Sequence, residues 1–172
     1  MRLNIGAGKE KCRGYVTLDN SPQVNPGILA DLEKKLPIKD NSYTEIVANH
    51  ILEHIENING LMKELNRISK EGAIIKIRVP FYLSVGAFMD PTHKRFFTPF
   101  TMNYFCDSHY NYETTDKPIF KIKKVELRCT FTRKLINKIF NPILNLNHNF
   151  YCKFLTSIIP CAEIYYELKV LK

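Results

Sequence analysis

Two glycines and an acidic residue follow short apolar runs near the start of the chain. Gly6 and Gly8 come directly after the run 3–5, and Asp19 comes directly after the run 15–18. Glycine tolerates positive φ and lets the backbone approach a ligand closely, whereas a carboxylate can accept hydrogen bonds from both hydroxyls of a ribose. If the two runs are parallel strands, these residues share the carboxyl edge of a sheet, where nucleotide-like ligands bind. The Gly-x-Gly on its own is equally consistent with an ordinary turn.

The spacing of these residues differs from that of a dinucleotide-binding motif. Lys11 stands where the third glycine of Gly-x-Gly-x-x-Gly would be, and Asp19 arrives sooner than the acidic residue expected about 20 residues further on. Only residues 9–14 separate the first two runs, whereas a parallel crossover normally needs roughly a dozen residues or more. We therefore expect a missing or much reduced first helix and a ligand without phosphates. A nicotinamide-dependent oxidoreductase is disfavoured.

The elements that must position these residues follow from the hydrophobic pattern. Apolar runs bounded by turn residues predict strands of a mostly parallel α/β sheet at 2–5, 15–19, 28–31, 44–49 and 73–79. A helix is predicted between the last two strands, from apolar residues at helical spacing: Ile55, Ile58, Leu61, Met62, Leu65 and Ile68. Gly72 stands where that helix would need a left-handed C-cap.

The second half of the chain predicts a long loop followed by strands and helices. Residues 81–116 are aromatic and irregular, and a loop of this length in a small domain usually serves a function. We expect a pair of strands at about 119–132 and a last strand over 164–170. Between them, helical segments within 135–160 should be interrupted at Asn141-Pro142.

Length and composition indicate one globular domain. The chain has 172 residues, 45% of them hydrophobic, and we expect neither a signal peptide nor a membrane span, which needs ~18 apolar residues. Five cysteines without metal-ligand spacing indicate reduced thiols in a cytosolic protein. The net charge of +8 lies entirely in residues 117–172. That excess predicts an acidic partner (nucleic acid, an anionic membrane surface or an acidic substrate) or simply a solvated face.

Four further motifs follow the glycines in a fixed order. They are Ala30-Asp31-Leu32, Leu36-Pro37, Asp40-Asn41-Ser42 and Leu52-Glu53-His54. Over about residues 3–105 the chain resembles the class I S-adenosylmethionine-dependent methyltransferases, and within them a small bacterial and archaeal branch. The resemblance implies a Rossmann-like α/β fold, mostly parallel with an antiparallel C-terminal strand, in a single domain over 1–172. Residues 1–80 would be the cofactor-binding half, and residues 81–172 the acceptor-side loop and the basic C-terminal part.

The resemblance implies S-adenosylmethionine as the cofactor. The residues that it assigns to the cofactor are Asn4, Gly6, Ala7, Gly8, Asp19, Asn20, Asp31, Leu32, Asn49 and His50. Asp19 would hold the ribose hydroxyls, Asp31 would accept from the adenine amino group, and Asn49 and His50 would line the methionine end. Asn4 replaces an acidic residue that usually contacts the amino group of the cofactor, so this contact would lack charge. The short first connection would leave the pocket less covered, unless a partner subunit in a homodimer or the later loop closes it.

Asp90 and His93, after the fifth strand, resemble an acceptor-side element of the same branch. Asp90 would orient His93 as the base that takes a proton from the acceptor, with His50 as the second candidate. Alternatively, Asp90 caps a turn and His93 bonds to the loop backbone. Glu53-His54 could be a buried pair at the start of the helix or a catalytic pair. The spacing of the histidines and Asp90 does not support a metal site, so we predict none.

The residues after the fourth strand bear on the acceptor. The Asn-Pro-Pro-aromatic element of methyltransferases that act on base amino groups is replaced by Asn49-His50-Ile51-Leu52, so nucleic acid is a disfavoured partner. We expect a small molecule or a glycan on a lipid carrier as the acceptor. The protein would be cytoplasmic, with its basic, apolar C-terminal third resting on an anionic membrane, although such a face is also consistent with a core. The alternatives are a binding or interaction module of this fold without turnover, and an RNA methyltransferase.

Overall fold

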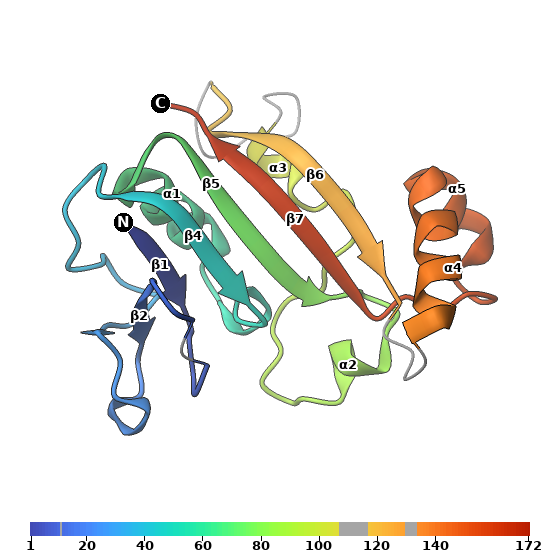
Figure 1. The fold of residues 1–172 in the computed structure, drawn as a ribbon, viewed down its shortest axis with the longest axis horizontal. Helices are drawn as coiled ribbons and strands as arrows, with labels where there is room; N and C mark the ends of the chain where they lie inside the picture. The colour runs from blue at the N-terminus through green and yellow to red at the C-terminus, as the bar shows by residue number, and fades with distance from the viewer. Residues whose placement is uncertain (11, 107–116, 130–133) are drawn as a thin grey trace.

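The computed structural model describes residues 1–10, 12–106, 117–129 and 134–172. Its described strands are β1 (Arg2–Ile5), β2 (Val16–Asp19), β3 (Ile28–Leu29), β4 (Tyr43–Asn49), β5 (Ser69–Pro80), β6 (Phe120–Arg128) and β7 (Glu163–Val170). Its described helical elements are η1 (Pro22–Val24), η2 (Leu52–His54), α1 (Ile58–Ile68), α2 (Val85–Phe88), α3 (Asn103–Cys106), α4 (Lys134–Leu146), α5 (His148–Phe150) and the π-helical η4 (Tyr151–Leu155). Figure 1 shows α4 and α5 at one end of a central sheet.

The strands form one mixed sheet in the order β3-β2-β1-β4-β5-β7-β6. β1 pairs in parallel with β2 and β4, and the pairs β2-β3 and β4-β5 are also parallel. β7 is antiparallel to β5 and to β6, between which it lies. The mostly parallel α/β sheet with an antiparallel C-terminal strand is confirmed. Of the strand pair predicted at about 119–132 the structure shows β6, and residues 130–132 lie outside the described part.

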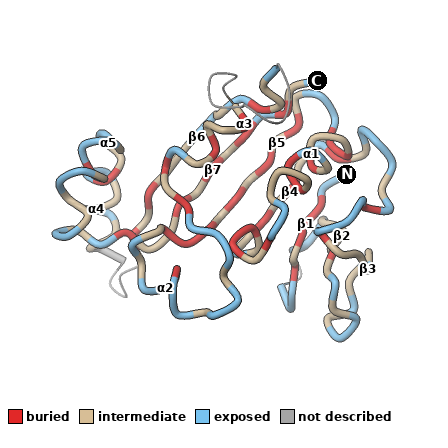
Figure 2. The backbone as a smooth tube through the Cα atoms, turned by 180° about the vertical axis from the view of Figure 1, so that it is seen from behind, coloured by how far each residue is buried: buried red, intermediate tan, exposed pale blue. Residues whose placement is uncertain are grey.

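Helices cover one face of the sheet and leave the other open. Figures 1 and 2 show α1 and α3 on the same face, and none of the described helices lies across the opposite face. The described residues between β1 and β2 (6–10 and 12–15) contain no helix, as the short connection predicts. Buried and half-buried residues alternate along most of β5 and β7, the pattern of strands with one covered face.

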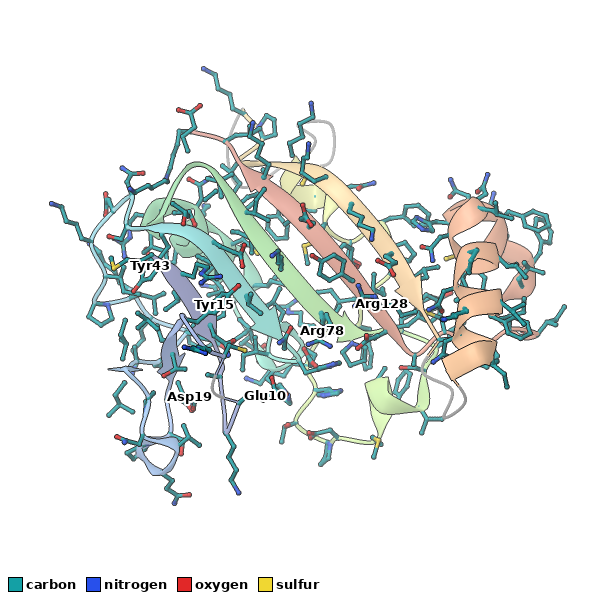
Figure 3. The ribbon with its side chains drawn as sticks, viewed as in Figure 1. Glu10, Tyr15, Asp19, Tyr43, Arg78 and Arg128 are labelled. Atoms are coloured by element: carbon teal, nitrogen blue, oxygen red, sulfur yellow. The ribbon has the colours of Figure 1, made fainter. Side chains whose placement is uncertain are left out.

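Charged side chains pair across the strands on the open face. The amine of Lys76 on β5 lies 3.0 Å from a carboxylate oxygen of Glu45 on β4. Arg78, also on β5, donates from Nε to Asn49 Oδ1 at 3.0 Å. Figure 3 shows Arg78 and Arg128 on this face. Because these polar groups find partners along the sheet surface, the face can meet water without a helix above it.

The predicted helix between β4 and β5 is α1. The side chain of Asn57 caps its first turn, because Oδ1 accepts from the amide of Gly60 at 2.9 Å. The buried face of the helix consists of residues from the predicted apolar stripe, namely Leu61, Met62, Leu65 and Ile68. This face packs into the core beneath β4 and β5.

The prediction that Gly72 ends α1 was wrong. The helix ends at Ile68, and its C-cap Ser69 is already extended and begins β5. The amide of Ser69 donates to the carbonyl of Asn66, so the chain leaves the helix without a left-handed residue. Gly72 has φ +74° but lies within β5.

Helix α4 continues through Pro142, so the predicted interruption at Asn141-Pro142 was wrong. Asn145 accepts from the amide of Leu127 and donates to its carbonyl, each at 2.8 Å. Asn141 Oδ1 accepts from the amide of Cys129 at 2.8 Å. These bonds attach the helix to β6, the edge strand, and offset the hydrogen bond that proline cannot donate. None of the described helices combines the length and the apolar character that crossing a bilayer requires.

Candidate cofactor and acceptor site

A cavity of about 230 Å³ lies where β1, β2 and β3 end and the loop after β4 begins. Its walls come from these strand ends, from the segment around η2 and from the loop after α2, and the lining residues are Gly6, Asp19, Asn20, Asp31, Leu32, Glu33, Ile51, His54, Ile55 and Lys94. The first five of these are among the residues predicted to hold the cofactor. The parallel sheet therefore brings these five residues together from three separate strand ends. This is what the sequence predicts for residues that directly follow parallel strands.

Gly6 has a backbone and surroundings that only glycine fits. Its φ is +59°, and a Cβ at this position would lie 2.4 Å from Cγ1 of Ile51 on the cavity wall. Gly8 also has a positive φ, of +50°, but no described atom lies within 4 Å of the place its Cβ would occupy. The backbone at Gly8 therefore borders open space that a ligand can approach closely.

The Asp19 carboxylate is fixed by backbone amides on both sides. Oδ2 accepts from the amide of Gly8 at 2.8 Å, and Oδ1 accepts from the amide of Ser21 at 2.9 Å. Figure 3 places Asp19 at the lower end of the first strands. Because each carboxylate oxygen has a second lone pair, Asp19 can still accept two ribose hydroxyls.

Asp31, at the end of the β3 segment, is held in a similar way. Its Oδ1 accepts from the amide of Glu33 at 2.9 Å, and Lys34 lies 3.4 Å from Oδ2. The Glu33 amide, with help from Lys34, lowers the pKa of the Asp31 carboxyl below its usual value. An ionised carboxylate at this point can accept a hydrogen bond from an exocyclic amino group such as that of adenine.

The other predicted cofactor residues do not line the cavity. Asn4 is 2% exposed, and its Nδ2 donates to the carbonyl of Glu10 at 3.5 Å. Ala7 is buried beside it, and Gly8 contributes its amide to Asp19. Asn49 Oδ1 already accepts from Arg78.

His50 is held between two carboxylates. Its Nδ1 lies 3.4 Å from Glu53 Oε1, and its Nε2 lies 3.4 Å from Glu163 Oε2. Glu163 and then Glu53 raise the pKa of His50 to about 9, in spite of its partial burial. His50 also has φ +49°, unusual for a residue with a side chain. A histidine that is protonated at neutral pH does not suit the role of second base that we predicted for it.

Asp90 and His93 do not form the predicted carboxylate–imidazole pair. Asp90 Oδ1 accepts from the amide and the hydroxyl of Thr92, at 2.8 and 2.7 Å. His93 Nδ1 lies 2.9 Å from the carbonyl of Ala87. The alternative interpretation, a capped turn with His93 on the loop backbone, therefore describes this segment.

Thr92 connects Asp90 to His54 instead. Its Oγ1 lies 2.9 Å from His54 Nδ1, and the ring of His54 meets the ring of His93 edge-on at 4.7 Å between centroids. His54 also lines the cavity, so His93, on the loop after α2, is one ring away from it. The sequence alone is consistent with a structural or a catalytic role for His54. The signal that could have identified His54 as a cavity residue is its place in the Leu-Glu-His motif after the fourth strand.

The neighbouring Glu53 ties the two segments together through its backbone. Its carbonyl accepts from the amides of Lys94 and Arg95, at 2.8 and 3.1 Å. Its side chain is buried, at 1% exposed. Glu53 is thus the buried member of the Glu53-His54 pair, whereas His54 lines the cavity.

Comparisons with known proteins match the chain to a methyltransferase domain and to solved structures of the same fold. A family model described as a methyltransferase domain matches residues 9–77. A search of curated proteins gave no match. An S-adenosylmethionine-dependent methyltransferase from Archaeoglobus fulgidus superposes with a TM-score of 0.64 at 16% identity, over 98% of this chain and 85% of the other.

Two more solved structures show how widely the fold is used. A methyltransferase of the same cofactor class from Mesorhizobium loti gives a TM-score of 0.61 at 16% identity, over 98% of this chain and 89% of its own. The [4+2]-cyclase SpnF gives a TM-score of 0.56 at 15% identity, over 98% of this chain and 74% of its own. Likeness at such identities shows the fold alone, and the family model covers 69 of the 172 residues. The chain thus has the fold of S-adenosylmethionine-dependent methyltransferases, and its residues 9–77 match the model of a methyltransferase domain.

Proposed function

We propose that the protein transfers a methyl group to a hydroxyl of a small molecule or of a glycan, including a glycan on a lipid carrier. The observation that carries the proposal is that the imidazoles of His54 and His93 stand beside the cavity that the predicted cofactor residues line. S-adenosylmethionine supplies a methyl group on a sulfonium and departs as a neutral thioether. A hydroxyl must lose its proton to attack that methyl group, and histidine is the side chain best suited to assist near neutral pH.

The cavity residues fit this cofactor. Asp19 would accept the two ribose hydroxyls and Asp31 the adenine amino group, each with lone pairs that the backbone amides leave over. The side chains of Leu32 and Ile51 offer apolar walls for the adenine ring. The open space beside Gly8 would admit the methionine end.

The acceptor side would act mainly by positioning, which in model reactions contributes ~7–11 kcal/mol to lowering a barrier. The carbonyl of Ala87 fixes His93 through Nδ1, which leaves Nε2 for the acceptor side. The chain from Asp90 through Thr92 fixes His54 in the same way. These two imidazoles are the groups that we assign to activation of the acceptor hydroxyl, with His93 first.

A lipid-linked acceptor is supported by an exposed apolar surface at the far end of the molecule. This α4–η4 surface consists of six residues that are each at least 37% exposed, namely Ile139, Ile143, Leu146, Phe150, Phe154 and Ile158. The sequence has no acidic residue from 127 to 162, and the exposed Lys138 and Lys153 lie among the apolar residues. An apolar surface with only basic charge is the chemistry that binds an anionic lipid surface. We therefore propose that this surface rests on an anionic membrane.

The test of the function separates the cofactor from the acceptor. Calorimetry with S-adenosylmethionine should show one binding site per chain. The protein is then incubated with deuterated-methyl S-adenosylmethionine and with separate lipid, water-soluble and RNA fractions, and the products are analysed by mass spectrometry. Label in the lipid or water-soluble fraction supports the proposal, and label in RNA only would replace it with the RNA alternative. Tight cofactor binding with no labelled product in any fraction would indicate the binding module without turnover.

A further inference from the structure

Three potential metal ligands converge beside the cofactor cavity. Glu53 and His54 come from η2, and His93 comes from the loop after α2. One ligand atom of each lies within 4.8 Å of the others. The two segments are held in register by the Glu53 carbonyl, which accepts from the amides of Lys94 and Arg95. The spacing in the sequence did not predict this cluster, because it joins two distant segments.

Hydrogen bonds orient both imidazoles for a ligand role. A carbonyl can only accept, so the bond between His93 Nδ1 and Ala87 O places the proton on Nδ1. The hydroxyl of Thr92 donates to Asp90 Oδ1, so it accepts from His54 Nδ1, which must also carry a proton. Each neutral ring then has its lone pair on Nε2. Metal-binding histidines are typically fixed in this way by an oxygen atom at the other nitrogen.

The carboxylate of Glu53 has unused bonding capacity. The side chain is 1% exposed, and among the described residues neither of its oxygens has a hydrogen-bond partner. Oε1 lies 3.4 Å from His50 Nδ1, whereas Oε2 has no such neighbour. Since His50 already faces Oε1, the unfavourable group is Oε2, a buried oxygen without a partner among the described residues, and a cation bound there would satisfy it.

We propose that Glu53, His54 and His93 bind a divalent transition-metal ion such as Zn²⁺. Two imidazoles and one carboxylate leave a coordination position open, as in catalytic zinc sites. Because His54 also lines the cofactor cavity, the ion would lie beside that cavity. With the ion bound, the two imidazoles would activate the acceptor as metal ligands and not as bases: a hydroxyl at the open position would have its pKa lowered and would release its proton to water before attacking the methyl group. This role rests on the proposed function, whereas metal binding itself does not.

The experiment measures metal binding without reference to turnover. Tag-free protein, with the exposed Cys12 replaced in the variant Cys12→Ser, is stripped with a chelator and titrated with Co²⁺ by absorption spectroscopy and with Zn²⁺ by calorimetry. One ion per chain is expected. His54→Ala, His93→Ala and Glu53→Gln should each weaken binding by about tenfold or more, and Thr92→Val by about tenfold through the orientation of His54.

A matched control is His148→Ala, which removes an imidazole of α5 outside the cluster and should leave the affinity unchanged. Circular dichroism establishes that each variant is folded. Absence of binding to the parent protein, or equal affinity in the cluster variants and the control, would overturn the proposal. Cofactor calorimetry on the same stripped samples separates this failure from failure of the proposed function, because the stripped protein should still bind S-adenosylmethionine.

Discussion

The carboxylates of the cavity are already oriented in the structure. Asp19 and Asp31 each accept hydrogen bonds from amides in the turns that follow their own strands, and Asp19 also accepts from the turn after β1. Turning either side chain away would break these bonds. Binding of a nucleoside should therefore need little rearrangement, which reduces the loss of conformational freedom on binding.

Replacing Asp19 should weaken binding of both S-adenosylmethionine and its demethylated product. In Asp19→Ala the ribose hydroxyls lose a charged acceptor, at a cost of roughly 1.5–3 kcal/mol, or about ten- to a hundredfold in affinity. Calorimetry measures both ligands. Asp19→Asn keeps the shape and one acceptor and should lose less affinity. Glu71→Ala removes an exposed carboxylate at the start of β5 and serves as the control. Unchanged affinity in Asp19→Ala would remove Asp19 from the ribose role.

The sequence predicted the cavity-lining residues whose position is determined only by the end of a strand. Gly6, Asp19 and Asp31 each follow a recognisable apolar run, and a parallel sheet necessarily gathers such positions at one edge. The contact between Thr92 and His54 could not be predicted in the same way. It depends on how an irregular loop folds back over η2, and no periodic pattern encodes that path.

At the scale of elements, the first half of the fold follows local sequence patterns, whereas the second half depends on contacts between distant segments. The strands up to β5 and the buried face of α1 follow hydrophobic periodicity and were predicted closely. Helix α4 was not, because Asn141-Pro142 is locally a signal for a helix start. The decisive contacts are those of Asn141 and Asn145 with the backbone of β6. A tertiary contact of this kind leaves no trace in local sequence preference.

The α4–η4 surface should bind anionic vesicles. In sedimentation assays we expect binding to vesicles with anionic lipid that decreases as salt is added, because each lysine contributes about 1 kcal/mol near such a surface. The double variant Phe154→Glu with Ile158→Glu should bind about tenfold more weakly or worse, since both exposed side chains would lose apolar contact with the lipid.

The matched control for the vesicle assay is Leu29→Glu. This variant places a charge on another exposed apolar residue, at the β3 edge far from α4 in the sheet, and should not change binding. Negligible binding of the parent protein to both neutral and anionic vesicles would exclude the membrane role.

At the scale of the whole molecule, a buried tyrosine of β7 connects the middle of the sheet to the loop after α2. Tyr166 is 0% exposed, and its hydroxyl donates to the carbonyl of Thr98. The nearby bridge between Phe81 and Phe97 holds the two ends of the same loop together. The position of His93 and of its neighbours therefore depends on the packing of the C-terminal strand.

Removing the buried hydroxyl should lower the free energy of unfolding. Tyr166→Phe removes one of the two donors to the Thr98 carbonyl, which keeps the amide of Thr101, so the loss should be that of one hydrogen bond, about 0.5–1.5 kcal/mol. Urea unfolding should show a lower midpoint with an unchanged slope. Tyr165→Phe is the matched control, because its hydroxyl donates to Glu167 on the open face, where water can replace it, and the loss should be about 0.5 kcal/mol or less. Equal losses in the two variants would contradict a specific role for Tyr166.

The position of β7 between β5 and β6 also determines the order in which the protein can be completed during synthesis. A ribosome releases residues in sequence, so β1 to β5 and the predicted cofactor residues emerge well before β7. Until Glu163–Val170 has emerged, β5 has an unpaired edge and β6 has no neighbour in the sheet. Unpaired edges are sites of association between chains. A nascent chain arrested before residue 163 should therefore depend on chaperones to remain monomeric, even though the edge predicted to bind the cofactor has already been synthesised.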